Sequence, residues 1–160
     1  DEMGFDSCTV APYMGRDAIE PFLSYANKAS FVLALTTNPG AEDFQYLHTK
    51  GKPAYEHVMA TVSKLASAES LMFVVGGTRP DELSSIRRQY PHHVFLVPGV
   101  GSQGGTLAQV LEHGLGADQA LLVNVSRDIL YQDSSRSFAD AAKSQAAYYQ
   151  DFMQQYLQKA

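Results

Sequence analysis

The sequence predicts an α/β fold built from parallel strand–helix units. Five short apolar runs recur along the 160 residues, at positions 7–13, 31–38, 72–78, 94–99 and 120–126. The segments between these runs carry apolar side chains at helical spacing. Strands that alternate with helices form right-handed βα units in a parallel sheet. Neither a linker nor a low-complexity segment interrupts the pattern, so we expect a single domain over residues 1–160.

Each predicted helix is marked by a few apolar side chains. Four helices are expected between the strands. In chain order, their apolar markers are Ile19 and Leu23 for the first, residues 55–65 for the second, Leu83 and Ile86 for the third, and Leu107 and Leu111 for the fourth. Two of them have candidate N-terminal caps: Thr78 and Asp81 resemble a capping box for the third, and Thr106 caps the fourth. A polar loop is expected at residues 48–53. The last helix is the longest. One face of it carries an apolar stripe that is typical of core contact and consists of Phe138, Ala142, Tyr149, Phe152 and Tyr156.

Composition and charge exclude several classes of protein. Hydrophobic residues make up 45% of the chain and the net charge is −5, which indicates a globular domain and argues against broad nucleic-acid binding. No apolar run approaches membrane-spanning length, so we expect no membrane partner. The only cysteine, Cys8, lies in an apolar run and is expected to be a buried thiol. A reducing compartment such as the cytoplasm fits this usage of cysteine.

Two closures of the sheet fit five βα units: an open doubly wound sheet, or part of a (β/α)8 barrel. A complete barrel takes about 250 residues, so five units in this chain would form an incomplete one. Residues 1–4 enter the first strand at once, with no initiator methionine and no helix before it. We therefore expect the first part of such a barrel to be missing from this chain.

Residues 94–105, VFLVPGVGSQGG, are the stretch that most directly suggests a ligand. The apolar run 94–97 predicts a strand buried on both faces, as in a parallel sheet. Glycines then open a loop that leads to the helix capped by Thr106. Backbone N–H groups and a helix N-terminus together attract phosphate, and glycines let it approach closely. The alternative interpretation is an ordinary tight turn between a strand and a helix.

A second loop offers a positive charge to the same ligand. Arg127 directly follows the run 120–126, which would hold its guanidinium at the mouth of the sheet for a bidentate phosphate contact. Gln103 can donate an amide hydrogen bond from the neighbouring loop. Arg127 could instead be a plain surface residue that forms ion pairs, and Asp128 is a candidate partner for it in either case.

Other sequence patterns are weaker indications of a ligand site. The loop 36–40, TTNPG, offers hydroxyl, amide and N–H groups that suit a heterocycle or a sugar, although a structural turn explains it nearly as well. Gly99, Gly101 and Gly104 match a dinucleotide fingerprint by letter, with Asp128 at a plausible distance for a ribose. His92 and His93 precede a strand, on the side opposite the expected site. The histidines lack metal-ligand spacing, so no metal is expected.

Four stretches of the chain resemble orotidine 5′-phosphate decarboxylase, in the bacterial branch with a Thr-Ser-Asn-Pro-type loop. They are DSCTVAPYMGRD, FVLALTTNPGAEDFQ, VFLVPGVGSQGG and LLVNVSRDILY, in the family's order and with appropriate spacings. The resemblance implies a (β/α)8 TIM barrel, of which this chain supplies the last five units, and a homodimer. It also implies cofactor-free conversion of orotidine 5′-monophosphate to uridine 5′-monophosphate in pyrimidine biosynthesis.

The resemblance further implies which residues meet the nucleotide substrate. The phosphate would be bound by Gln103, Arg127 and Gly101, and the pyrimidine and ribose pocket would be lined by Thr37, Asn38, Pro98 and Gly99. Thr37 stands where the family often has serine and keeps the hydroxyl. Asp128 replaces what is often a small residue, which affects the local shape of the phosphate site.

The catalytic residues of the family are expected outside this chain. The family uses an Asp-x-Lys-x-x-Asp motif after its third strand, and no such motif occurs here. A missing N-terminal barrel segment, or a companion chain, would have to supply it, and this chain alone is expected to be inactive. Two alternatives remain open at this point: a non-catalytic phosphate- or nucleotide-binding α/β module, and an NAD-dependent dehydrogenase.

Overall fold

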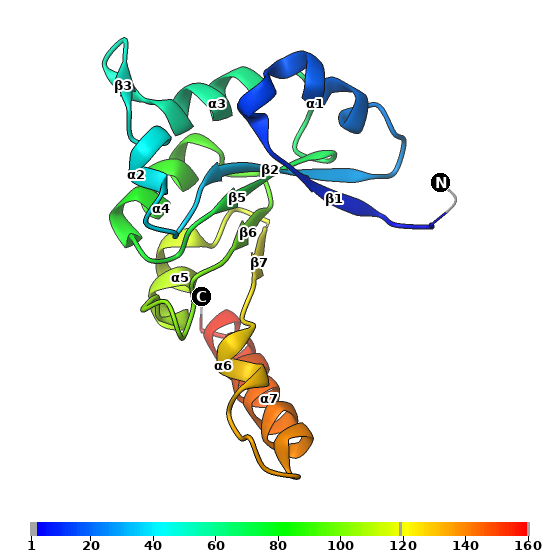
Figure 1. The fold of residues 1–160 in the computed structure, drawn as a ribbon, viewed down its shortest axis with the longest axis vertical. Coiled ribbons are helices and arrows are strands. Elements are labelled where there is room, and N and C mark those ends of the chain that lie inside the picture. Colours follow the sequence, from blue (N-terminus) through cyan, green and yellow to red (C-terminus); the bar gives the residue numbers. More distant parts are fainter. Residues whose placement is uncertain (1–2, 119, 160) are drawn as a thin grey trace.

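Five parallel strands form one sheet in the computed structural model, which describes residues 3–118 and 120–159 (Figure 1). The strands of this sheet are β1 (Ser7–Val10), β2 (Ala29–Leu35), β5 (Leu71–Val75), β6 (Phe95–Val97) and β7 (Leu121–Val123). They lie side by side in chain order, and each pairs in parallel with the next. The prediction of five parallel βα units is therefore confirmed.

Helices follow the strands as the spacing of apolar residues predicts. They are the 3-10 helix η1 (Pro12–Met14) and the α-helices α1 (Arg16–Leu23), α2 (Ala41–Phe44), α3 (Ala54–Val62), α4 (Pro80–Gln89), α5 (Leu107–Gly114), α6 (Arg127–Leu130) and α7 (Phe138–Leu157). The first strand ends earlier than predicted, at Val10, because Pro12 begins η1. Proline has no N–H to donate to a sheet, and its fixed φ suits the first position of a helix.

The two faces of the sheet have different surroundings. Alternate strand residues such as Val32, Phe73 and Phe95 are fully buried against the helices, where they pack with Met59 and Leu83. Burial of each such side chain contributes roughly 1.5–3 kcal/mol.

The opposite face is the concave side, and its exposure increases across the sheet. Phe31 on β2 is 8% exposed, whereas Leu122 on β7 is 49% exposed. The prediction that residues 94–97 are buried on both faces is wrong, because Phe95 and Val97 are buried on the helix-covered face but Leu96 is partly exposed on the concave face.

Cys8 is exposed, so the prediction of a buried thiol is wrong. It lies on β1, the edge strand, which pairs on one side only, with β2. Its nearest polar partner is the Ser30 hydroxyl, with 3.9 Å between sulfur and oxygen. An apolar run in sequence predicts a strand, but it does not reveal that the strand lies at an edge.

Two local predictions are corrected by the structure. The polar loop at residues 48–53 is a hairpin of β3 (His48–Thr49) and β4 (Lys52–Pro53), whose turn residues Lys50 and Gly51 have φ values of 50° and 78°. Positive φ at both central residues is the geometry of a type I′ turn.

The capping box at Thr78 and Asp81 is absent, since Arg79 is the N-cap of α4 and no side chain caps it. Pro80 begins the helix instead. The predicted cap of α5 is confirmed, because Thr106 Oγ1 accepts a 3.3 Å hydrogen bond from the N–H of Gln109.

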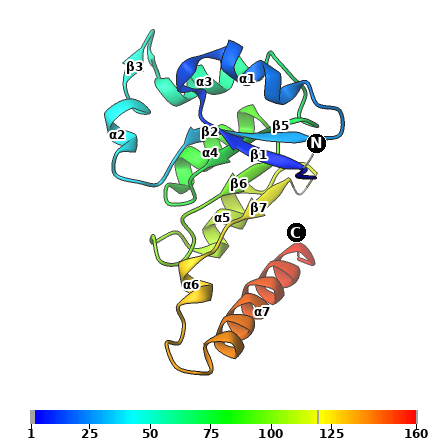
Figure 2. The same cartoon turned by 45° about the vertical axis from the view of Figure 1, so that its right-hand side comes forward.

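The C-terminal helix α7 runs back against α6 and α5 (Figure 2). Tyr149 is buried, and Phe152 and Tyr156 pack on the core, as the stripe predicts. Phe138, at the start of the helix, is 57% exposed and lies outside the core. Within the described ranges, no helix combines the length and the apolar character needed to cross a membrane.

Candidate functional site

The loops after β2, β6 and β7 leave the same edge of the sheet, on the left in Figure 2. Ligands of α/β folds bind at this edge, beyond the carboxyl ends of the strands. A hollow of about 80 Å³ lies there, lined by Pro98, Gly99, Val100, Ser102, Gln103, Asn124, Ser126 and Arg127. The structure therefore brings together four of the predicted site residues from two separate loops. Asn124 and Ser126 complete the lining and were not singled out from the sequence.

Residues 124–126 connect β7 to the short helix α6, which begins at Arg127. The main-chain oxygen of Ser126 accepts hydrogen bonds from the N–H groups of Ile129 and Leu130, which fixes the first turn. Arg127 is exposed and makes no ion pair with any residue that the structure describes. Its guanidinium can therefore present a planar pair of donors to an anion in the hollow.

Thr37 and Gln103 join the loop after β2 to the loop after β6. The hydroxyl of Thr37 donates a hydrogen bond of 2.7 Å to Oε1 of Gln103. With its oxygen held in this way, Gln103 keeps the Nε2 donor for another acceptor. The Oδ1 of Asn38 accepts a 2.6 Å hydrogen bond from the hydroxyl of Thr36, within the same loop. Neither Thr37 nor Asn38 lines the hollow, and Thr37 reaches it through its bond to Gln103.

Gln45, which follows α2, holds the same loop from the other side. Its Oε1 accepts a 2.8 Å hydrogen bond from the N–H of Thr36, and its Nε2 donates a 2.7 Å hydrogen bond to the Thr36 hydroxyl. Sequence reasoning did not assign Gln45 a role. Its position at the end of a four-residue helix gives no local pattern that marks it as a support for the site.

Two glycines let Thr37 come close to the neighbouring strands. A Cβ atom built at Gly76 would lie 2.6 Å from Cγ2 of Thr37, and one at Gly99 would lie 2.8 Å from the same methyl group. Gly99 also has a φ of +99°, which L side chains rarely adopt. A larger residue at either position would displace Thr37 and with it the bond to Gln103.

Gly101 contributes to the site in a different way from the predicted phosphate contact. Its N–H donates a 2.9 Å hydrogen bond to the carbonyl of Gly105, within the loop. It does not line the hollow beside Arg127 but a second hollow of about 350 Å³, which Thr106 and Tyr149 also line. The N-terminus of α5 and the guanidinium of Arg127 therefore face different hollows, and the predicted anion site is divided between them.

Asp128 does not pair with Arg127, contrary to the expectation from its place in the sequence. Its Oδ2 accepts hydrogen bonds from the hydroxyl of Tyr149 at 2.6 Å and from Nε2 of Gln145 at 2.8 Å. Burial raises the pKa of Tyr149 to about 12, and the hydrogen bond to Asp128 adds to this shift. Asp128 is thus engaged by α7, which leaves no free carboxylate for the ribose contact of a dinucleotide site.

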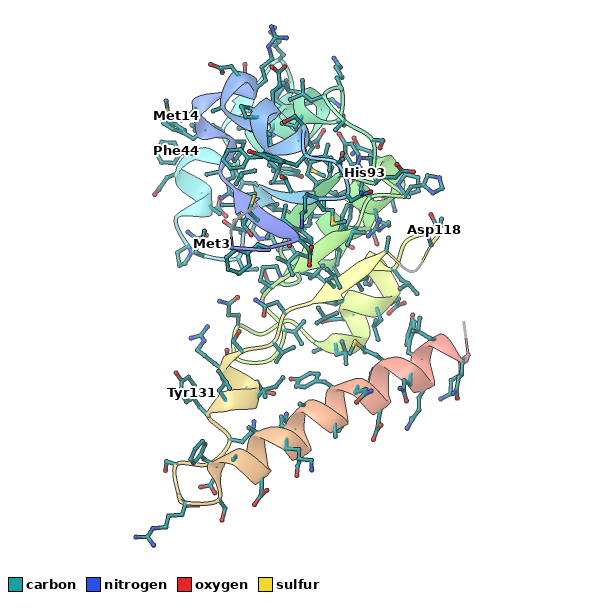
Figure 3. The ribbon with its side chains drawn as sticks, turned by 90° about the vertical axis from the view of Figure 1, so that its right-hand side faces the viewer. Met3, Met14, Phe44, His93, Asp118 and Tyr131 are labelled. Atoms are coloured by element: carbon teal, nitrogen blue, oxygen red, sulfur yellow. The ribbon has the colours of Figure 1, made fainter. Side chains whose placement is uncertain are left out.

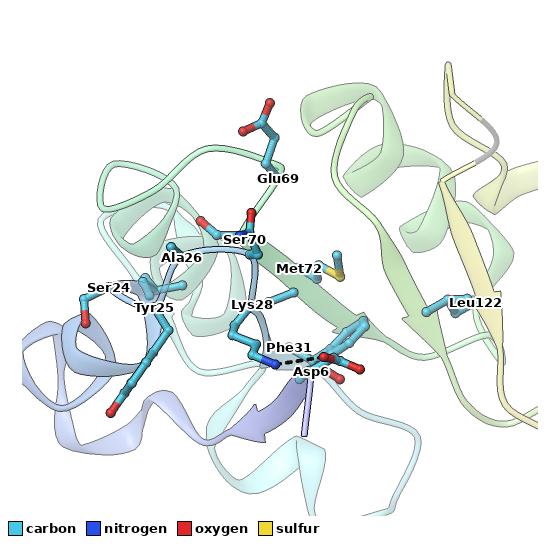
Figure 4. Close-up of a pocket in the computed structure, with 14 residues that line it drawn as sticks. Asp6, Ser24, Tyr25, Ala26, Lys28, Phe31, Glu69, Ser70, Met72 and Leu122 are labelled. Carbon is cyan, nitrogen blue, oxygen red and sulfur yellow. Dashed lines mark hydrogen bonds and ion pairs between the residues drawn. The ribbon is translucent and has the colours of Figure 1, made fainter. Parts of the chain in front are cut away.

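Another hollow, of about 690 Å³, lies on the concave face of the sheet and extends to its opposite edge (Figure 4). Met72 and Leu122 line it, and a 2.8 Å ion pair joins Lys28 to Asp6 beside it. Both charged residues precede their strands, so this pair lies at the amino ends, where barrels carry residues that serve stability. The size of this hollow reflects the uncovered concave face of the sheet rather than a built ligand site.

His92 and His93 precede β6, at the same amino-terminal edge of the sheet, whereas the other histidines are scattered over β3, α3 and α5. His93 and Asp118 lie on the opposite side of the molecule from Met14 and Phe44 (Figure 3). Nδ1 of His92 lies 3.0 Å from Oδ2 of Asp118. Within the parts of the chain that the structure describes, no three His, Cys, Asp or Glu side chains cluster in a way that could hold a metal ion.

Comparison with known proteins points to one family. The sequence pattern of the Orotidine 5'-phosphate decarboxylase / HUMPS family matches residues 1–142. The orotidine 5'-phosphate decarboxylase of Christiangramia forsetii is 46% identical over 159 residues, which are 99% of this chain and 58% of the relative. That of Bacteroides fragilis is 42% identical over 158 residues, which are 98% of this chain and 58% of the relative. The chain thus spans somewhat more than half the length of these relatives.

Solved structures give the same result for the architecture. Leishmania donovani UMP synthase superposes with a TM-score of 0.76 at 35% identity, over 93% of this chain and 34% of that chain. The orotidine 5'-monophosphate decarboxylase of Plasmodium berghei superposes with a TM-score of 0.77 at 29% identity, over 96% and 49%. The five-stranded sheet and its helices match part of the TIM barrel of these proteins. By sequence and by architecture, the chain belongs to the orotidine 5'-phosphate decarboxylase family.

Proposed function

We propose that this chain forms the phosphate-binding and base-binding part of an orotidine 5′-monophosphate decarboxylase. The observation that carries the proposal is the convergence of Gln103 and Arg127 on one hollow, with Thr37 bonded to Gln103. Membership of the family supports the reaction, since curated relatives that are 42–46% identical bear the name of this enzyme.

The residues around the hollow have distinct roles in this proposal. Arg127 binds two oxygens of the substrate phosphate in bidentate fashion, and Gln103 donates from Nε2 to the same group. Thr37 and Asn38 face the pyrimidine and the ribose, and the Pro98–Gly99 segment lines the space between base and phosphate. The product, uridine 5′-monophosphate, keeps the phosphate and therefore also binds.

Phosphate binding promotes the reaction by anchoring a part of the substrate that does not react. Release of CO2 from the pyrimidine leaves a carbanion, which must receive a proton from a positioned acid. Binding energy at the phosphate holds the reacting carbon beside that acid. In our proposal the acid belongs to an Asp-x-Lys-x-x-Asp motif on a segment that supplies the first three strands. The exposed Leu122 on the concave face supports such a covering segment.

A homodimer and a cytoplasmic location are part of the same proposal. Tyr13, Met14 and Phe44 are 86%, 76% and 65% exposed, and the rings of Tyr13 and Phe44 lie 6.4 Å apart. Met14 and Phe44 are neighbours at one end of the molecule (Figure 3). An exposed apolar patch of this kind supports a second copy as its cover. The exposed thiol of Cys8 supports a reducing compartment.

The test is calorimetry with uridine 5′-monophosphate and uridine, on a barrel completed with the first three strands. We expect the nucleotide to bind far more tightly than the nucleoside. Arg127→Ala should weaken nucleotide binding by about 2–4 kcal/mol, because a charge-assisted bidentate contact is lost. Arg88→Ala, which removes an exposed arginine from α4, is the matched control.

Equal affinity for nucleotide and nucleoside would contradict the phosphate assignment. A preference for any phosphate compound, with no dependence on the base, would favour a non-catalytic phosphate-binding module instead.

A further inference from the structure

The carboxylate of Asp128 is bonded to the C-terminal helix, although Arg127 is its neighbour in sequence. Oδ2 accepts hydrogen bonds from Tyr149 at 2.6 Å and from Gln145 at 2.8 Å, and Oδ1 accepts one from Gln132 at 3.3 Å. Gln145 and Tyr149 are four residues apart on α7, so one turn of that helix presents both donors to a single oxygen.

This cluster also touches the loop that bears Gln103. A Cβ atom at Gly101 would lie 2.8 Å from Cβ of Asp128 and 3.2 Å from the hydroxyl oxygen of Tyr149. Tyr149 is 9% exposed and belongs to the hydrophobic core, so its hydroxyl is held in place by the packing of its ring. The Asp128 side chain thus fills the space where α6, α7 and the loop after β6 meet.

A carboxylate at this place is unfavourable for a phosphate site unless something holds it. A free Asp128 could pair with the Arg127 guanidinium and compete with the ligand, or it could repel a phosphate dianion in the adjoining hollow. The two donors on α7 form hydrogen bonds with the carboxylate oxygen, which stabilise its negative charge and point it away from the hollow.

We propose that Tyr149 and Gln145 are positioning residues, which hold Asp128 against α7 and so keep Arg127 available for the substrate phosphate. This inference rests on the proposed function and adds to it a role for the C-terminal helix. The raised pKa of Tyr149 means that its hydroxyl stays protonated, and able to donate, throughout the neutral pH range.

The test compares Tyr149→Phe with wild type in the completed barrel, by calorimetry with uridine 5′-monophosphate and uridine. The variant keeps the packed ring and removes only the donor. We expect nucleotide affinity to fall roughly tenfold, the scale of one hydrogen bond to a charged group, while nucleoside affinity is unchanged. The same loss should appear as a raised KM for the substrate with kcat less affected.

Two further variants identify the cause. Tyr148→Phe removes a hydroxyl from the adjacent position of α7, where the side chain is 57% exposed, and it should have no effect. In an Asp128→Asn background, Tyr149→Phe should no longer weaken nucleotide binding, because no negative charge is left to compete for Arg127.

Each other outcome overturns the inference. If Tyr149→Phe binds the nucleotide as well as Tyr148→Phe does, the hydroxyl has no positioning role. If the loss persists in the Asp128→Asn background, or affects nucleoside equally, the hydroxyl of Tyr149 does not act by holding the Asp128 carboxylate away from Arg127. Failure of the proposed function is separately visible, because wild type itself would then bind nucleotide and nucleoside equally.

Discussion

The hydroxyl of Thr37 and the side-chain oxygen of Gln103 are joined by a 2.7 Å hydrogen bond between loops that lie 66 residues apart in sequence. This bond orients the Gln103 amide, so that its nitrogen is presented to the ligand rather than free to rotate. We expect Thr37→Val to weaken binding of uridine 5′-monophosphate by about 1 kcal/mol, since the variant has the same shape and lacks the donor. Calorimetry on the completed barrel measures the change.

Thr37→Ser is the matched control, because serine keeps the hydroxyl and loses only the methyl group that packs on Gly76 and Gly99. It should bind nearly as well as wild type. Equal losses in the serine and valine variants would show that the methyl contact, and not the hydrogen bond, is what matters at this position.

Arg87 is a buried cation whose partners are main-chain carbonyls. It is 7% exposed, and its guanidinium donates to the carbonyls of Gly114, His93 and Ala120 at 2.8, 2.7 and 2.9 Å. Burial lowers its pKa to about 10, so it remains charged at neutral pH. Arg87→Met should lower the free energy of unfolding by about 2–4 kcal/mol, because several buried carbonyls lose their donor.

Urea unfolding measures this loss, and Arg88→Met is its control. Arg88 is the next residue of α4 and is exposed, so its replacement should change stability by no more than about 0.5 kcal/mol. A loss as small for Arg87 as for Arg88 would mean that water replaces the guanidinium at these carbonyls.

His93 makes stability depend on pH. Its Nε2 atom is buried with no hydrogen-bond partner among the residues that the structure describes, and its ring stacks on that of Phe73 with 5.3 Å between centroids. Burial, followed by the charges of Arg87 and His92, lowers the pKa of His93 below its ordinary value. The unfolded chain therefore binds a proton at higher pH than the folded protein. The stabilisation is present above the ordinary pKa of about 6.5, and it is lost as pH falls toward the lower folded-state pKa.

His93→Phe should remove this part of the pH dependence, because phenylalanine stacks without titrating. The expected difference in slope below pH 6.5 is at most about 1.4 kcal/mol per pH unit, measured by urea unfolding across the range. His92→Asn, at an exposed position, should keep most of the slope. An unchanged slope in His93→Phe would assign the dependence to other groups.

The strands and main helices could be predicted because their signal is local. Apolar runs set the five strands, and the cap at Thr106 and the apolar spacing set α5. The β3–β4 hairpin could not be predicted, since two-residue strands have no apolar alternation and Lys50 is not a typical residue for positive φ. The exposure of Cys8 could not be predicted either, because it depends on which strand lies at the edge.

The site was predictable where residues lie in the loops that follow strands, as Gln103 does after β6 and Arg127 after β7. The supports of the site were not, because each of them depends on a chain reversal. Asp128 meets Tyr149 across 21 positions only because α7 folds back against α6. Nearest-neighbour reasoning therefore paired Asp128 with Arg127. The phosphate contact of Gly101 is implied by the resemblance alone and stays a prediction, and the structure places Gly101 close to Asp128.

The final prediction separates binding from catalysis. The lysines of this chain are Lys28, Lys50, Lys52, Lys64, Lys143 and Lys159. Lys28 pairs with Asp6 before the strands begin, and Lys52 lies on the β4 hairpin strand, paired with Glu56 at 3.3 Å. Neither stands at the carboxyl end of a sheet strand between two aspartates, which is where the proposed acid would stand to protonate the carbanion.

We therefore expect the 160-residue polypeptide alone to show no measurable decarboxylation of orotidine 5′-monophosphate. Adding a segment that supplies strands one to three, with its Asp-x-Lys-x-x-Asp motif, should restore turnover, and replacing the central lysine of that segment should abolish it. The assay follows loss of the substrate, with intact mass verifying the composition of each sample. Turnover by this chain, shown by mass to have no companion, would place the catalytic acid among its own residues, and Lys28 would be the first to replace.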